Sequence, residues 1–169
     1  MGSLNNILSL LFILLLQVFV CNNINLFGYI NPYLYIAFIF LFPLTNNRFI
    51  PLSLAFIYGI TIDFFSDTGG IHALSLVLVC YLRIFFLKLF FRKSEIDFLL
   101  FKLHQEAFGK VFNYVLTLTL IHHFVMFLFA NFSLANISEI LLNTIYSTAF
   151  TVVLYFFGSF LFRRKISTL

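Results

Sequence analysis

Long apolar runs, separated by short polar segments, are the feature of this sequence that most restricts its fold. They lie at about residues 4–21, 30–44, 49–66, 70–91, 109–131 and 137–162. A helix needs roughly 20 mostly apolar residues to cross a bilayer, and most of the runs approach that length. Charged residues make up only 9% of the chain, against about 25% in soluble domains. The sequence therefore predicts one all-α integral membrane domain, residues 1–169, with about six transmembrane helices.

The basic residues indicate how these helices are oriented. Nine of the ten Lys and Arg residues fall at alternate ends of the runs, and the three connections at the other ends contain none. Because cytoplasmic loops are enriched in Lys and Arg, we expect both termini on the cytoplasmic side. This orientation explains the net charge of +4, so no nucleic-acid partner is expected. The segment 92–108 is expected to be an amphipathic cytoplasmic loop.

Prolines and glycines mark the expected helix ends. Pro32 and Pro51 fall in the first turns of the second and third runs, where a missing N–H costs nothing, and Pro43 lies near the end of the second run. After the third run, Asp67 or Thr68 is expected to cap the next helix, and the two glycines that follow permit a tight reversal. Runs three and four are therefore predicted to form an antiparallel hairpin.

This hairpin also carries the densest group of polar residues. Ionisable side chains inside a membrane are costly, so they are candidates for function. The candidate polar core, for partner binding or for structure, comprises Gly59, Asp63, Asp67, Gly70, His72 and Arg83. Arg83 is expected about 13 Å deeper than Asp63 in a simple hairpin, so His72 or Asp67 is the nearer partner of that carboxylate. The alternative interpretation is that these residues only hold helices together.

Other polar residues are expected to face neighbouring helices. The last run has a stripe at spacings of three and four, namely Asn143, Ser147, Thr151, Tyr155 and Gly158. Gln17 is interpreted in the same way. The pair His122–His123 is a weak metal candidate, because adjacent helical residues point about 100° apart. We find no GxSxG, HExxH, P-loop or paired-acid motif, so no enzyme activity, catalytic residue, cofactor or metal is expected.

Several short segments together suggest a family. They are Leu14-Leu15-Leu16-Gln17, Asn31-Pro32, Gly59-Ile60-Thr61-Ile62-Asp63 followed by Gly69, and Tyr81-Leu82-Arg83. With these segments the chain resembles the bacterial rod shape-determining protein MreD over essentially its whole length. The GxxxD segment through Gly70 and Ala73 is the most specific part. The chain departs from the pattern in its short second run and its Phe-rich, Trp-free composition.

The resemblance implies a function that composition does not. It implies a non-enzymatic scaffold subunit of the rod complex in the bacterial cytoplasmic membrane, which supports peptidoglycan synthesis and cell shape. Its implied partners are MreC and, indirectly, MreB filaments and the synthases RodA and class B penicillin-binding protein, besides membrane lipid. It also implies a fold similar to the S components of energy-coupling-factor transporters.

Two other functions remain open. A small-molecule-binding transport subunit would enclose a ligand between the polar stripes of the third, fourth and sixth runs. Against it, S components dock through alanines in the first span, whereas Leu10 to Val20 contains no Ala or Gly. A lipid-linked wall enzyme would need acid and base groups on one membrane face, which only Asp63, Asp67 and His72 provide.

Overall fold

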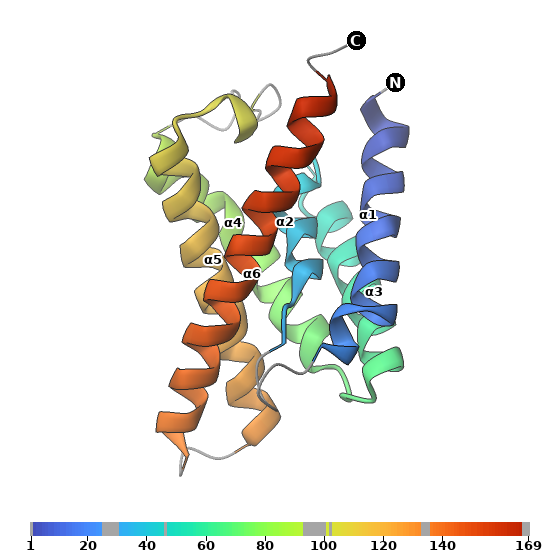
Figure 1. Cartoon of the computed structure of the whole chain (residues 1–169), viewed down its shortest axis with the longest axis vertical. Coiled ribbons are helices and arrows are strands. Elements are labelled where there is room, and N and C mark those ends of the chain that lie inside the picture. The colour runs from blue at the N-terminus through green and yellow to red at the C-terminus, as the bar shows by residue number, and fades with distance from the viewer. Residues whose placement is uncertain are drawn as a thin grey trace.

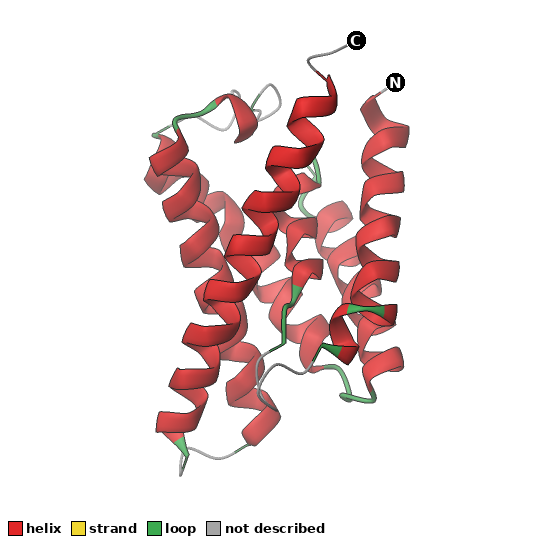
Figure 2. Ribbon diagram, in the orientation of Figure 1, coloured by secondary structure: helices red, strands yellow, loops and turns green. Residues whose placement is uncertain are grey.

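Every regular element in the described part of the chain is helical (Figure 2). The computed structural model describes residues 2–24, 31–45, 47–92, 101, 103–132 and 136–166. The α-helices are α1 (Gly2–Phe19), α2 (Ala37–Leu41), α3 (Phe49–Ser66), α4 (Ile71–Phe91), α5 (Phe108–Asn131) and α6 (Ile137–Ile166). Single 3-10 turns form η1 (Cys21–Asn23), η2 (Leu34–Ile36) and η4 (Leu103–Gln105).

Four of the described helices are long and apolar enough to cross a membrane. They are α3 with 18 residues, α4 with 21, α5 with 24, and α6 over the 24 residues Ile137–Phe160. Their bounds lie close to the predicted runs, because uninterrupted apolar sequence leaves a helix as the only way to pair backbone groups in lipid. In α1 the described apolar stretch is shorter, Ile7–Asn23. The prediction of an all-helical fold is thus confirmed for the described residues, and the length and composition of these four helices are compatible with a multi-pass membrane protein.

The second predicted span is not a continuous helix. Of the described residues 31–44, only Leu34–Leu41 is helical, first as η2 and then as the five residues of α2. A proline disfavours the helical conformation of the residue before it, and Phe42, which precedes Pro43, is extended with φ −70° and ψ 129°. The expectation of a full second helix over 30–44 is therefore wrong.

Both ends of the chain lie at the same end of the bundle (Figure 1). The chain runs away from that end along α1, α3 and α5, and back along α4 and α6. Arg48 directly precedes α3, Lys88 lies in the last turn of α4 and Lys110 in the first turn of α5, so basic residues gather at the end with the termini. Most of the predicted amphipathic loop, 92–108, lies outside the described residues.

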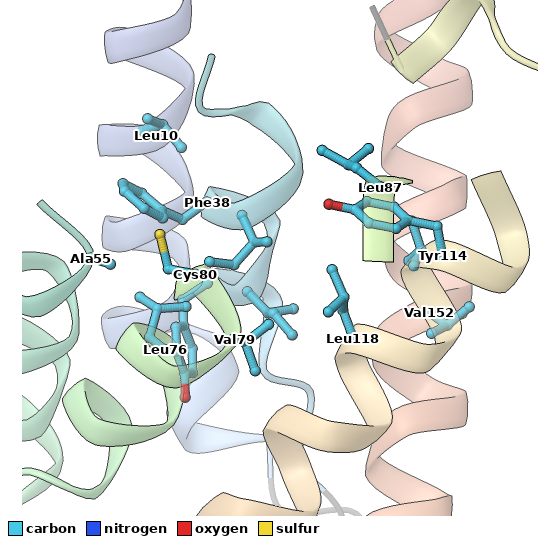
Figure 3. Close-up of a cluster of buried hydrophobic side chains, with 14 of the residues drawn as sticks. Leu10, Phe38, Ala55, Leu76, Val79, Cys80, Leu87, Tyr114, Leu118 and Val152 are labelled. Carbon is cyan, nitrogen blue, oxygen red and sulfur yellow. The ribbon is translucent and has the colours of Figure 1, made fainter. Parts of the chain in front are cut away.

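The apolar core surrounds α2 and draws on every helix. Figure 3 shows core side chains from α1 to α6, with Phe38 beside Leu10 of α1 and with Leu76, Val79 and Cys80 of α4 beneath it. All five residues from Tyr35 to Ile39 are buried, at 4% exposure or less. The longer helices thus enclose α2. Their side chains lie next to the backbone N–H and C=O groups at its two ends.

Candidate functional site

Asp63, near the end of α3, binds the start of α4. Its Oδ1 accepts hydrogen bonds from the backbone N–H of His72 at 3.0 Å and from the Thr68 hydroxyl at 2.6 Å. Its Oδ2 accepts one from the backbone N–H of Ala73 at 2.8 Å. The first N–H groups of a helix lack partners within that helix, and a carboxylate there is favoured by both hydrogen bonding and charge. Asp63 therefore caps α4 from the preceding helix.

Gly59 allows α3 and α4 to approach each other at this point. A Cβ at position 59 would lie 2.4 Å from the Cα and 2.8 Å from the N of Ala73. Gly59 lies one turn before Asp63 on the same helix face. The two residues of the GxxxD segment therefore act together. Gly59 allows α3 and α4 to lie close to each other, and Asp63 binds the N–H groups of α4 that this close approach brings within reach.

The turn between these helices differs in part from its prediction. Gly69 and Gly70 have φ of 66° and 101°, a region that glycine enters at little cost, and they form the predicted reversal. The expectation that Asp67 or Thr68 caps α4 is wrong. Asp67 is exposed, with φ 53°, just beyond the end of α3, and Thr68 donates to Asp63 instead. Asp67 therefore lies off the buried face that Gly59 and Asp63 share.

Arg83, in the middle of α4, is 1% exposed and binds the end of α2. Its guanidinium donates to the backbone carbonyls of Ile39 at 3.3 Å, Phe42 at 3.2 Å and Pro43 at 3.1 Å. The last carbonyls of a helix have no partner in that helix and carry partial negative charge. Arg83 thus caps α2 in the buried interior, where carbonyls without a hydrogen bond are costly. Its partners are separate from those of Asp63.

The strap, residues 31–36 including η2, is held by side chains of the outer helices. Gln17 of α1 donates its Nε2 to the Pro32 carbonyl at 3.2 Å and accepts the Tyr35 N–H on Oε1 at 3.3 Å. Thr151 of α6 accepts the Tyr33 N–H at 3.0 Å. These side chains replace helical hydrogen bonds that an extended segment cannot make. Gln17 and Thr151 therefore face inward, as the sequence predicted for Gln17 and for the polar stripe of the last run.

A tyrosine and two histidines meet in the interior beside this strap. The Tyr35 hydroxyl lies 2.8 Å from His72 Nδ1 and 2.8 Å from His122 Nε2. The Met126 sulfur lies 3.8 Å from the same oxygen. Tyr35 and His122 have no exposed surface, and His72 retains 6%. The hydroxyl thus joins the strap to α4 and α5.

The second histidine of the pair is directed toward α6. His123 Nδ1 lies 2.8 Å from the Thr148 hydroxyl, and the Tyr33 ring lies 5.2 Å from the His123 ring. The two histidine rings therefore bind different elements, as expected from their angular separation on one helix. No group of three or more His, Cys, Asp or Glu that could hold a metal occurs among the residues that the structure describes.

Of the predicted candidates, the structure brings Gly59, Asp63 and His72 together and places Arg83 and Asp67 elsewhere. Sequence reasoning did not identify Tyr35 or the His72–His122 contact. Tyr35 is separated from these histidines by 37 and 87 residues, and no periodic pattern connects such positions. A usable signal was the position of His122 deep within a long apolar run, where an ionisable residue needs a partner.

The described residues form an all-α protein with polar contacts between helices in its interior, and four of its helices are long and apolar enough to cross a membrane. Comparisons with protein-family models, with curated proteins and with solved structures give no match.

Proposed function

We propose that this chain is a non-enzymatic scaffold subunit of the bacterial rod complex, related to MreD and located in the cytoplasmic membrane. The observation that supports the proposal is the role of Gly59 and Asp63, the residues on which the resemblance chiefly depends. Both fix α3 against α4, and the Asp63 carboxylate accepts three hydrogen bonds from the same hairpin. A carboxylate held by three hydrogen bonds stabilises the packing of the hairpin and is poorly placed to transfer a proton. This supports a rigid binding surface over an enzyme.

The proposed partner is MreC, through which the chain would be linked to MreB filaments and to the synthases RodA and class B penicillin-binding protein. The position of both termini and of basic residues at one end of the bundle agrees with a cytoplasmic placement of that end. Acidic Asp67 and Glu139 adjoin the opposite end, where an extracytoplasmic partner would approach.

Recovery of partners from the native host tests this proposal. Tagged protein is purified in a mild detergent, and copurifying proteins and small molecules are identified by mass spectrometry. We expect MreC and wall synthases to be recovered with the unaltered chain and with Asp67→Asn, and to be reduced in Gly59→Ala, which alters the hairpin packing. Equal recovery of unrelated membrane proteins, with neither MreC nor a synthase enriched, would contradict the scaffold role.

A second candidate function is a small-molecule-binding subunit of a transporter. It is favoured by the polar side chains from the strap, α4, α5 and α6 that meet in the interior, as they do at many substrate sites of transporters. A copurified ligand near one molecule per chain, without MreC, would favour this function over the scaffold.

A further inference from the structure

Four buried polar atoms on α5 and α6 have no hydrogen-bond partner among the described residues. They are Thr119 Oγ1, His122 Nδ1, His123 Nε2 and Ser147 Oγ. All four residues have no exposed surface. The first three lie within about one turn of α5, and Ser147 adjoins Thr148, which contacts His123.

The two hydroxyls and the two imidazoles differ in how they find partners. A helical Ser or Thr hydroxyl can turn to a carbonyl of its own helix, as Ser75 does to Ile71 and Thr144 to Ile140. The two imidazoles are not free to turn in this way, because Tyr35 holds His122 through Nε2 and Thr148 holds His123 through Nδ1. The nitrogens of His122 and His123 are therefore the atoms that need a partner from outside their helix, because an unpaired buried polar group costs about 1–3 kcal/mol.

The contacts of this cluster allow two arrangements of its protons, and the proposal below rests on one of them. The Tyr35 hydroxyl has one proton and two imidazole neighbours, so it donates to one and accepts from the other. If His122 Nε2–H donates to Tyr35, and Tyr35 donates to His72, both bonds form and His122 Nδ1 keeps a lone pair. If His123 likewise donates Nδ1–H to the Thr148 hydroxyl, it keeps a lone pair on Nε2. Both unpartnered nitrogens are then acceptors, and their missing partner is a donor.

The surroundings favour an uncharged donor. The carboxylate next to this cluster, that of Asp63, already accepts three hydrogen bonds from the hairpin. A cation beside His122 and His123 would need a counter-charge at low dielectric, where an unpaired charge is far more costly than a neutral group. The described residues also hold no group of three metal-binding side chains.

The strap covers this region. The Tyr33 ring lies 5.8 Å from the His72 ring and 5.2 Å from the His123 ring, and the Tyr35 hydroxyl bridges His72 and His122. Hydrogen bonds from the side chains of Gln17 and Thr151 to the strap backbone hold this segment to α1 and α6. A molecule would therefore reach the histidine nitrogens when the strap separates from α5, without any long helix having to unwind.

We propose that the region between the strap, α5 and α6 is a binding site for a small uncharged molecule that donates hydrogen bonds to His122 Nδ1 and His123 Nε2. Water and an organic solute with a hydroxyl or amide N–H share this chemistry. The proposal does not depend on the scaffold role, because it concerns the interior of the bundle and not its partner surface.

The test is nitrogen NMR of the full chain, labelled with 15N-histidine and reconstituted in lipid nanodiscs. The chain has four histidines, which single His→Gln variants assign; where one variant does not fold, its signal follows by elimination. We expect both nitrogens to give the signal of a lone pair that accepts a hydrogen bond. Free lone pairs at both positions, an N–H at either position, or imidazolium signals would overturn the proposal.

Two further measurements distinguish the source of the donor. Magnetisation transfer from water to the two imidazoles, with no compound recovered on denaturing extraction, identifies water as the donor. Recovery of a compound at about one molecule per chain identifies an organic solute. Ser147→Ala is expected to shift the His123 Nε2 signal. Its control, Ser75→Ala, removes an equally buried hydroxyl that bonds its own helix and should leave the signal unchanged. Equal responses to both changes would count against Ser147 as part of the site.

Discussion

Replacement of Asp63 by alanine should destabilise the protein more than any other change of a hairpin carboxylate. Asp63→Ala removes three hydrogen bonds, one from the Thr68 hydroxyl and two from buried backbone N–H groups of α4. Loss of a helix cap costs about 0.5–2 kcal/mol, and hydrogen bonds to a charged group contribute about 1.5–3 kcal/mol each. Since these contributions overlap, we expect the free energy of unfolding to fall by about 2–4 kcal/mol.

Asp63→Asn should have an intermediate effect. The amide keeps one acceptor oxygen for α4 but directs an NH2 group at the remaining N–H, so about half of the loss is expected, roughly 1–2 kcal/mol. Equilibrium unfolding in lipid–detergent micelles, followed by intrinsic tyrosine fluorescence or circular dichroism, measures both variants. Asp67→Asn is the matched control, because this exposed, left-handed residue tolerates asparagine and should change stability by less than about 0.5 kcal/mol. If Asp63→Ala unfolded together with the unaltered protein, the capping argument would fail.

Three further changes test the remaining contacts by the same unfolding measurement. Gly59→Ala should destabilise the protein by about 1–3 kcal/mol because the added Cβ would overlap Ala73. Gly158→Ala is the control, and it should be neutral or stabilising because the added Cβ would meet open space. If both changes altered the free energy of unfolding in the same direction, the close-approach argument would be refuted. Arg83→Met should leave the α2 carbonyls unpaired and cost about 3 kcal/mol or more, and Arg83→Lys should recover part of that; a stable methionine variant would show that the cap is dispensable. Tyr35→Phe should cost about 2 kcal/mol, because two imidazole nitrogens lose their partner; an unchanged midpoint would argue against the bridge.

The sequence predicts the long helices well because their apolar length is a local property. α3 begins and ends at the predicted residues, Phe49 and Ser66, and the glycine reversal follows it. The sequence indicated the interruption of the second run in part, because Pro43 lies within it. The number of residues that stay helical depends on contacts with other helices, which the sequence does not show. Arg83 supplies the partner that makes a short helix tolerable there, and it is some 40 residues away.

The polar contacts of the site were predicted less completely. Asp63 does bind at His72, but through the backbone N–H and not the imidazole, because Gly59 brings the helix start itself within reach. The imidazole is instead directed to Tyr35 in the strap. Such a contact depends on the path of an extended segment through the bundle, which neither periodicity nor spacing encodes.

The strap also has a consequence for the order in which the protein is assembled. Its partners include Gln17, synthesised before it, and His72, His122 and Thr151, synthesised long after it. The strap and α2 together contain only eight helical residues, Leu34–Leu41. So short a helix leaves backbone N–H and C=O groups of this part of the chain without hydrogen bonds in lipid. During biosynthesis it must therefore wait at the membrane surface, or in a protected and hydrated site, until α6 has been inserted. A helix synthesised more than 100 residues later, α6, thus completes the contacts of the strap.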